Sequence, residues 1–195
     1  GGGFGLKLHT YSDEISTAAL SIMLKQPIKF IADRLESFLS DIHARGHTVT
    51  AKMALTSDGI IQAIDLQDTA AGGAYLIHPR TSVIEPLLVA VCTPLGYSME
   101  HYRANVSLVY QNKVPTAQYR GVGMPVASLV MEGLMDSAAR KLEMDKVDIR
   151  QRNLRPDDAY PCKAVSGETL EGLSQQAALE QVQEAAEALQ SLQAA

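Results

Sequence analysis

The sequence predicts an α+β fold, in which a mixed sheet containing a β-hairpin is packed against helices. Three observations lead to this prediction. Apolar residues recur at helical spacing near both ends of the chain, they alternate with polar residues between positions 49 and 66, and helices and strands follow one another without regular alternation. A parallel sheet of repeated βαβ units is therefore not expected.

The N-terminal part of the chain is expected to hold two helices and a short strand. A Ser-Asp-Glu triplet, typical of a helix start, precedes an amphipathic pattern that stops at Pro27, which predicts a helix over residues 15–26. The apolar run at 28–31 is interpreted as a short strand. Residues 35–42 again show helical spacing and predict a second helix.

A β-hairpin is the next predicted element. Apolar and polar residues alternate over 49–55 and again over 60–66, and the Ser-Asp-Gly sequence at 57–59 is a turn signal between them. Residues 68–118 show no clean period, and within them we expect a strand near 106–110.

A long helix is predicted to begin at Gly123-Met124-Pro125, with proline in its first turn. A short helix over 145–153, a loop over 155–168 and a final helix over 173–192 complete the prediction. The apolar face of the long helix is expected to consist of Val126, Leu129, Val130, Leu134, Ala138 and Leu142.

Composition excludes several classes of protein. The 195 residues are 46% hydrophobic and 20% charged, as in globular domains, and the net charge of -5 leaves no basic face for nucleic acid. No stretch reaches the roughly 18 apolar residues of a membrane span, and no secretory signal opens the chain, so a soluble protein without a membrane segment is expected. Cys92 and Cys162 are too few for a cluster or a four-cysteine zinc site, and are interpreted as unpaired thiols.

The other titratable residues offer no clear site. The five histidines lack paired metal-ligand spacing, since His43 and His47 straddle an Arg-Gly turn, and we interpret all five as solvated or structural. Asp33, Arg34 and Glu36 are expected to form a local ion pair. Tyr119 is interpreted as an interior tyrosine with a satisfied hydroxyl, and the alternative is that it reaches the pocket.

Two glycine-rich segments remain to be explained. The chain opens Gly-Gly-Gly-Phe-Gly, and a second segment, Tyr119-Arg120-Gly121-Val122-Gly123, precedes the long helix. The first segment fits neither the Walker pattern nor the dinucleotide fingerprint. Glycines allow backbone N–H groups to approach a bulky or anionic ligand, although a cloning scar would also explain the first three.

Five segments together resemble one family in order and spacing. They are GGGFG at 1–5, PIKFIADRLE at 27–36, ALTSDGII at 54–61, PTAQYRGVGMP at 115–125 and DIRQRNL at 148–154. That family is the molybdenum hydroxylases, which includes the large subunits of xanthine dehydrogenase, aldehyde oxidase and carbon monoxide dehydrogenase. The resemblance implies a partial molybdopterin-binding domain of the xanthine dehydrogenase-like fold over 1–165, followed by a helical segment over 166–195.

The resemblance also implies roles for six residues in two loops. The first loop would pack on the pyranopterin and approach the apical ligand of molybdenum, with backbone contacts near the metal at Phe4 and Arg120. Arg120 would add a positive charge and act as the catalytic residue, although outside this context a surface ion pair explains it, and Phe4 would also serve as a core aromatic. The cofactor-binding residues implied are Gly2, Gly3, Phe4, Gly5, Arg120 and Gly121.

Departures from the family pattern restrict the implied substrate. Leu8 stands where purine-oxidising members carry glutamate, and by residue counting their arginine would fall near Leu88. Gly121 stands where carbon monoxide dehydrogenases carry the cysteine that holds copper. An apolar pocket remains, which suits aldehydes or aromatic N-heterocycles better than purines.

The implied function is therefore the cofactor-binding part of a larger molybdenum oxidoreductase that uses water as its oxygen source. The expected cofactor is molybdenum-molybdopterin in its cytosine dinucleotide form, with iron–sulfur clusters and FAD carried by partner domains or subunits. The remainder of the molybdenum subunit would be a further partner, and the isolated chain is expected to be inactive and to self-associate. The expected location is cytoplasmic, or periplasmic if a signal precedes the chain. The alternative is a non-catalytic assembly or interaction module without a cofactor.

Overall fold

The computed structural model describes residues 2–193, and it divides them into two compact units. Each unit is assembled from separate stretches of the chain. The first unit takes the residues up to 49 together with 68–89 and 106–126, and the second takes 50–67, 90–105 and the residues from 127 onward. A single strand can therefore belong to both units, as the strand at residues 47–55 does.

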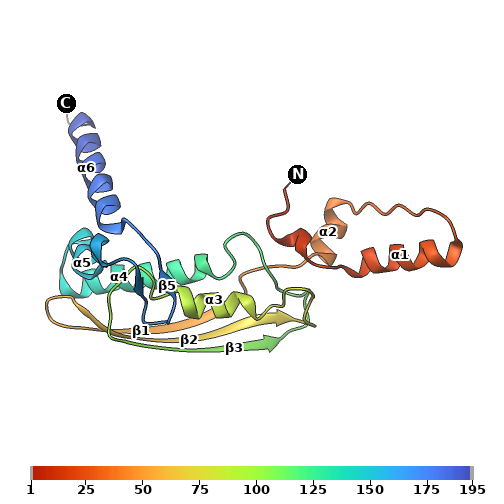
Figure 1. The fold of residues 1–195 in the computed structure, drawn as a ribbon, viewed down its shortest axis with the longest axis horizontal. Coiled ribbons are helices and arrows are strands. Elements are labelled where there is room, and N and C mark those ends of the chain that lie inside the picture. The colour runs from red at the N-terminus through yellow and green to blue at the C-terminus, as the bar shows by residue number, and fades with distance from the viewer. Residues whose placement is uncertain (1, 194–195) are drawn as a thin grey trace. The chain divides into compact units, whose positions relative to one another are not determined.

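A three-stranded sheet has the strand order β1-β2-β3 (Figure 1), with β1 at His47–Leu55, β2 at Ile61–Gly73 and β3 at His101–Tyr110. The turn between the first two strands is closed by the N–H of Thr56, which donates to the carbonyl of Ile60 at 3.0 Å. The predicted hairpin is confirmed. The predicted strand at 106–110 proves to be the second half of β3.

Three helices belong wholly or mainly to the first unit. They are α1 (Ser12–Leu24), α2 (Arg34–Ser40) and α3 (Ile84–Cys92), and a 3₁₀ turn, η1 (Leu6–Leu8), precedes them. The predicted helices near 15–26 and 35–42 are confirmed as α1 and α2. The predicted strand at 28–31 is wrong, because residues 27–33 have no regular structure and no neighbouring strand with which to pair.

The helix α2 begins at a reciprocal capping box. The Asp33 carboxylate accepts from the N–H of Glu36 at 2.8 Å, and the Glu36 carboxylate accepts from the N–H of Asp33 at 2.8 Å. These two acids thus satisfy backbone donors at the helix start. The predicted local ion pair of Asp33, Arg34 and Glu36 is corrected to a capping role.

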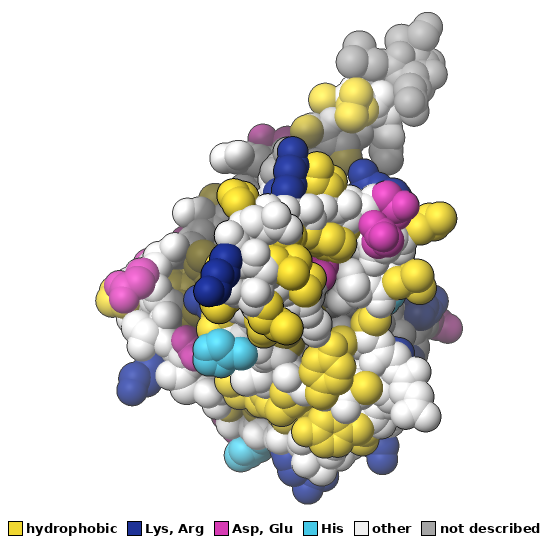
Figure 2. Space-filling model, turned by 90° about the vertical axis from the view of Figure 1, so that its right-hand side faces the viewer, with side chains coloured by type: hydrophobic (Ala, Val, Ile, Leu, Met, Phe, Trp, Pro, Cys, Tyr) yellow, Lys and Arg dark blue, Asp and Glu magenta, His cyan; other side chains and the backbone are white. Residues whose placement is uncertain are grey.

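The apolar residues of α1 and α2 are largely exposed on the described chain. Ile22 is 77% exposed and Leu39 78% exposed, although both lie at the positions that predicted an amphipathic helix. Figure 2 shows hydrophobic side chains gathered at the surface of one face of the molecule. The exposed large apolar residues between positions 15 and 39, which we call the α1–α2 apolar surface, are Ile15, Leu20, Ile22, Met23, Leu24, Phe30, Ile31, Leu35, Phe38 and Leu39.

The second unit has a continuous hydrophobic core under α4 (Met124–Leu142) and α5 (Lys146–Asn153). The predicted helix starting near 123 is confirmed, and its predicted face is confirmed in part: Ala138 is buried and Leu134 and Leu142 pack against the core, whereas Leu129 is 76% exposed. The buried residues of α4 are alanines and methionines: Ala127, Met131, Met135, Ala138 and Ala139. The core consists of Ile61, Ile64, Tyr97, Met131, Met135, Ala138, Ala139 and Ile149.

Asn153 joins the hairpin to α5 inside the second unit. Its side chain accepts from the N–H of Ile61 at 2.8 Å and donates to the carbonyls of Gly59 at 2.8 Å and Ile149 at 2.7 Å. The residue is 1% exposed. The Arg-Asn-Leu sequence noted above thus has a structural role, because Asn153 satisfies three buried backbone groups.

The C-terminal part contains more structure than the predicted loop at 155–168. A 3₁₀ turn, η2 (Asp157–Ala159), is followed by the antiparallel strands β4 (Cys162–Lys163) and β5 (Thr169–Leu170). Helix α6 (Gln175–Gln193) confirms the predicted final helix. The α+β fold class is confirmed, since helices and a sheet make up the chain. The predicted boundary at residue 165 remains a prediction.

Candidate functional site

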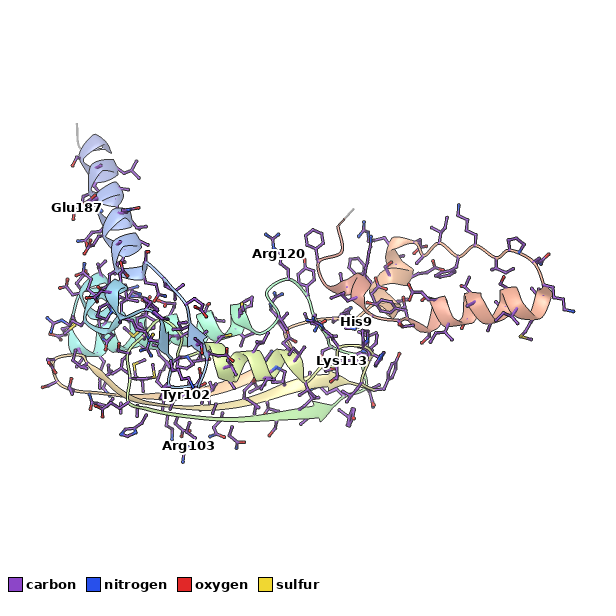
Figure 3. All side chains as sticks on the ribbon, in the orientation of Figure 1. His9, Tyr102, Arg103, Lys113, Arg120 and Glu187 are labelled. Atoms are coloured by element: carbon purple, nitrogen blue, oxygen red, sulfur yellow. The ribbon has the colours of Figure 1, made fainter. Side chains whose placement is uncertain are left out.

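The two glycine segments meet within the first unit. The N–H of Arg120 donates to the carbonyl of Phe4 at 2.8 Å, and the ring centroids of Phe4 and Tyr119 lie 6.4 Å apart. Figure 3 shows Arg120 on the loop that precedes α4. Segments at the start of the chain and near residue 120 are therefore neighbours, as the resemblance implied.

Close packing explains some of the glycines. Gly5 has φ +99°, and a Cβ placed there would lie 2.7 Å from the carbonyl oxygen of Gln118. Gly121 has φ +86°, and a Cβ there would meet Pro125 at 2.9 Å. Gly123 lies directly against the backbone of α3 at Glu85. These three positions need glycine for the chain's own packing, whether or not a ligand binds.

Gly3 differs from these three, because the nearest atom to an added Cβ is 3.9 Å away, in Lys7. Its backbone is exposed, as is that of Gly2, where a Cβ would touch only the movable ring of Phe4. Within residues 2–193, the amide N–H groups of Phe4, Gly5 and Gly121 donate no backbone hydrogen bond. The first segment therefore offers open backbone and free donors on one side.

A groove of about 660 Å³ lies beside these segments in the first unit. Phe4 is 52% exposed there, and the aromatic rings of Phe38 and Tyr119 contribute apolar surface. Arg34 and Arg45 place two positive charges on the same groove, against the single carboxylate of Asp41. Such a lining suits a ligand that combines flat rings with negative charge.

A buried ionic cluster lies next to this groove, and the sequence analysis missed it. His47 Nδ1 lies 2.8 Å from the carboxylate of Asp68, and His47 Nε2 lies 3.7 Å from that of Glu85. The His47 side chain is only 4% exposed. Burial lowers the pKa of His47, but the Asp68 and Glu85 carboxylates outweigh this effect and raise the pKa to about 9.

A sequence signal for this cluster existed in β2. Asp68 follows Ile64 and Leu66 at a spacing of two, so alternation alone would place its carboxylate on the buried face. A buried carboxylate requires a partner. That partner is His47, which the sequence analysis compared only with His43 as a pair of metal ligands. In the structure His43 is exposed, and its ring lies 3.2 Å from the carbonyl of Phe38.

Other candidates are accounted for by local contacts. Tyr119 lies beside the groove and under the guanidinium of Arg45, so it is partly exposed and not an interior residue. Cys92 and Cys162 are unpaired thiols, as interpreted from the sequence. Among residues 2–193, no group of three His, Cys, Asp or Glu side chains is placed to hold a metal ion, and no helix there is long and apolar enough to cross a membrane.

Two converging glycine loops beside an aromatic and cationic groove are the arrangement expected of a cofactor-binding domain. The particular domain is established by comparison with known proteins. The model of the molybdopterin cofactor-binding domain matches residues 1–154, and the chain belongs to this family, the molybdenum hydroxylases.

Several relatives support this assignment. The chain is 36% identical to the nicotine 6-hydroxylase large subunit of Paenarthrobacter nicotinovorans over 155 residues. This match covers 79% of this chain and 19% of the relative. It is 33% identical over 171 residues to the nicotinate dehydrogenase large molybdopterin subunit of Eubacterium barkeri, covering 88% of this chain and 39% of that one. The chain therefore spans only a fraction of the length of these relatives.

The fold agrees with that of a solved structure. Quinoline 2-oxidoreductase from Pseudomonas putida 86 superposes with a TM-score of 0.90 at 32% identity, covering 100% of this chain and 25% of that one. The similarity extends over both units. The predicted xanthine dehydrogenase-like fold is thus confirmed.

The residues of this chain fit part of a molybdopterin site. Both polar side-chain atoms of Gln118 are buried without a partner among the described residues, directly beside Gly5. The open backbone at Gly2 and Gly3 and the free N–H groups nearby match the needs of an anionic ligand. The assignment of individual residues as cofactor contacts remains a prediction.

Proposed function

We propose that this chain is the molybdopterin-binding part of the large subunit of a molybdenum hydroxylase. The observation that carries the proposal is the convergence of the two glycine segments, at the bond between Arg120 and Phe4, in a chain whose family binds this cofactor. Gly2, Gly3, Phe4 and Gly5 would approach the cofactor through their backbone.

Arg120 and Gly121 would line the opposite side of the metal. Arg120 is exposed, so its guanidinium is free to face a ligand, and it is the proposed catalytic residue. When bound, molybdenum would supply the redox centre at which a substrate C–H group is hydroxylated with oxygen from water. The role of this chain is to bind and orient the cofactor and to place positive charge beside it.

The proposed substrate is an aromatic N-heterocycle, with an aldehyde as the second candidate. Nicotine, nicotinate and quinoline, which name the relatives above, all contain a nitrogen ring. Leu8 offers no polar anchor of the kind that purine oxidation requires.

The proposed cofactor form is the cytosine dinucleotide, and the proposed electron acceptors are iron–sulfur and flavin subunits. The relatives are named as large subunits, which supports an assembly of more than one subunit. A cytoplasmic location is proposed with it. The isolated chain is expected to bind little molybdenum and to lack turnover, because it corresponds to a small share of each relative.

The test is metal and pterin analysis of a complete large subunit that contains this chain. We expect about one molybdenum per subunit, a fluorescent oxidised pterin and cytidine monophosphate after hydrolysis. A folded, complete subunit that is purified with its partners and contains neither metal nor pterin would contradict the proposal and favour the non-catalytic module. Release of a different nucleotide would contradict only the dinucleotide form.

A further inference from the structure

Arg45 contacts the second glycine loop in two ways. Its Nη2 donates to the carbonyl of Arg120, and its guanidinium carbon lies 5.3 Å from the ring centroid of Tyr119. A cation above an aromatic ring and a charge-assisted hydrogen bond are both directional. A single side chain therefore contacts two consecutive residues of the loop.

The backbone of Arg45 is held from the opposite direction. Its N–H points between the two carboxylate oxygens of Glu85, at 3.1 and 3.2 Å. Glu85 is 2% exposed and belongs to α3. A buried carboxylate without hydrogen-bond partners is costly in free energy, so loss of this contact would be unfavourable. The contact therefore holds the backbone of Arg45 in place relative to α3.

Glu85 in turn contacts a buried chain of charged residues. His47, two residues after Arg45, lies 3.7 Å from Glu85 and 2.8 Å from Asp68 on β2. The imidazole thus bridges two carboxylates from different elements. The contacts run from β2 through His47 and Glu85 to Arg45, and from Arg45 to the loop.

The second loop has a conformation that requires such support. Val122 has φ 50°, which is rare for a β-branched residue, and Gly121 before it has φ +86°. Arg45 itself has φ 63°. Non-glycine residues persist in this region of conformational space only where surrounding contacts hold them there.

We propose that Arg45 is a positioning residue for the loop at 119–122, anchored by the buried Asp68–His47–Glu85 cluster. Arg45 holds the carbonyl of Arg120 so that the N–H of the same residue stays bonded to Phe4, which keeps the two glycine loops together. The inference rests on the proposed function for its purpose, since the loop geometry matters because the cofactor would bind there.

Hydrogen exchange of the 195-residue chain, without cofactor, tests the proposal. In Arg45→Gln, which removes the charge and the ring contact, we expect the amides of Arg120 and Val122 to exchange about tenfold faster. Amides of residues 61–67, in the second unit, are expected to exchange as before. Arg103→Gln is the matched control, because Arg103 also donates two bonds, to Asp65, but lies in the second unit.

Arg45→Lys separates positioning from general packing. Lysine can still donate to the Arg120 carbonyl but lacks the planar fork, so protection of Arg120 and Val122 should be partly restored relative to Arg45→Gln. Unchanged exchange at both amides in Arg45→Gln would overturn the inference. If Arg45→Gln speeds amide exchange throughout the chain, the exchange pattern of Arg45→Lys decides between positioning and general packing. A change confined to 119–122 supports the inference, and an equal change throughout overturns it.

The molybdenum content of the complete large subunit distinguishes the two proposals. If the proposed function fails, the unsubstituted subunit contains no molybdenum, whereas the exchange result on the chain still holds. If the inference fails, the unsubstituted subunit contains molybdenum and Arg45→Gln leaves loop exchange unchanged. If both hold, Arg45→Gln should lower metal content several-fold while Arg103→Gln does not.

Discussion

Gly5 lies so close to Gln118 that an added Cβ would be 2.7 Å from the Gln118 carbonyl oxygen, whereas an added Cβ at Gly3 would meet nothing nearer than 3.9 Å. The absence of a side chain thus has a different physical reason at each of these two glycines. The first is required by the chain's own packing and by its φ of +99°. The second leaves space on an exposed backbone.

This difference predicts opposite results for two alanine substitutions. Gly5→Ala should lower the free energy of unfolding by about 1–3 kcal/mol, since it adds strain and a clash. Gly3→Ala should change it by less than about 0.5 kcal/mol, but should reduce molybdenum content in the complete subunit. Urea unfolding and metal analysis measure both effects. Full metal content in Gly3→Ala would argue against a ligand at this backbone.

Arg120→Ala should separate folding from catalysis. The structure uses the backbone N–H and carbonyl of Arg120, which alanine retains, while the side chain is exposed. Stability should therefore change by less than about 0.5 kcal/mol, and kcat of the metal-loaded enzyme should fall about 100-fold or more. Steady-state kinetics at measured metal occupancy give the answer. Unchanged kcat would remove Arg120 from the catalytic role.

The buried cluster predicts a pH dependence of stability. The pKa of His47 is about 9 in the folded chain against an ordinary value of 6.5. The protonated form is therefore favoured by folding, so the contribution is complete below pH 6.5 and is lost as pH rises through 9. We expect the free energy of unfolding to fall by on the order of 2–3 kcal/mol across this window.

Urea unfolding of the chain at several pH values between 6 and 9.5 measures this loss. His47→Gln should be less stable at pH 6.5 and should lack most of the pH dependence, because no imidazolium remains between Asp68 and Glu85. His101→Gln is the control, since His101 is 76% exposed. A parallel pH profile in the unsubstituted chain and in His47→Gln would show that another group titrates.

Asn153 should be a major contributor to the stability of the second unit. Asn153→Ala leaves the N–H of Ile61 and the carbonyl of Gly59 buried without their partner, which should cost about 2–4 kcal/mol. Gln151→Ala, exposed on the same helix, should cost less than about 0.5 kcal/mol. Thermal and urea unfolding compare the two. Equal effects would mean that the three bonds of Asn153 contribute little.

The α1–α2 apolar surface predicts that the isolated chain self-associates. Burying large apolar side chains removes them from water, and several of these are more than half exposed. The double substitution of Ile22→Gln and Leu39→Gln should shift the chain towards monomer in light scattering at micromolar concentration. Leu189→Gln, an exposed leucine on α6, is the control. A concentration-independent monomer without substitution would contradict this prediction.

Local structure was largely predictable from the sequence. The helices α1, α2, α4, α5 and α6 follow from capping residues, prolines and helical spacing, and the hairpin of β1 and β2 follows from alternation around a turn. These signals are local because they depend on backbone hydrogen bonds between near neighbours. Where a partner from elsewhere was needed, as for the strand predicted at 28–31, the prediction was wrong.

The buried face of α4 was also only partly predictable from the sequence, because it depends on partners from elsewhere in the chain. Of the predicted face Val126, Leu129, Val130, Leu134, Ala138 and Leu142, the structure buries Ala138 and packs Leu134 and Leu142 against the core, but it exposes Leu129 and also buries Met131 and Met135. Both sets of residues have helical periodicity, and the choice between them depends on the neighbouring elements. The core partners of Met131 and Met135, which include Ile61, Tyr97 and Ile149, come from other elements, and the pattern of hydrophobicity within α4 does not reveal them.

For the site, the sequence by itself determined the two glycine segments, their order and their resemblance to molybdenum hydroxylases, because motif identity and spacing are properties of the chain. Only the tertiary structure decided that Phe4 and Arg120 share a hydrogen bond, that Gly5 is required by packing while Gly3 is open, and that His47 bridges Asp68 and Glu85. Each of these depends on residues far apart in the chain, whose approach is set by the combined packing of the sheet, α3 and the loops of the first unit.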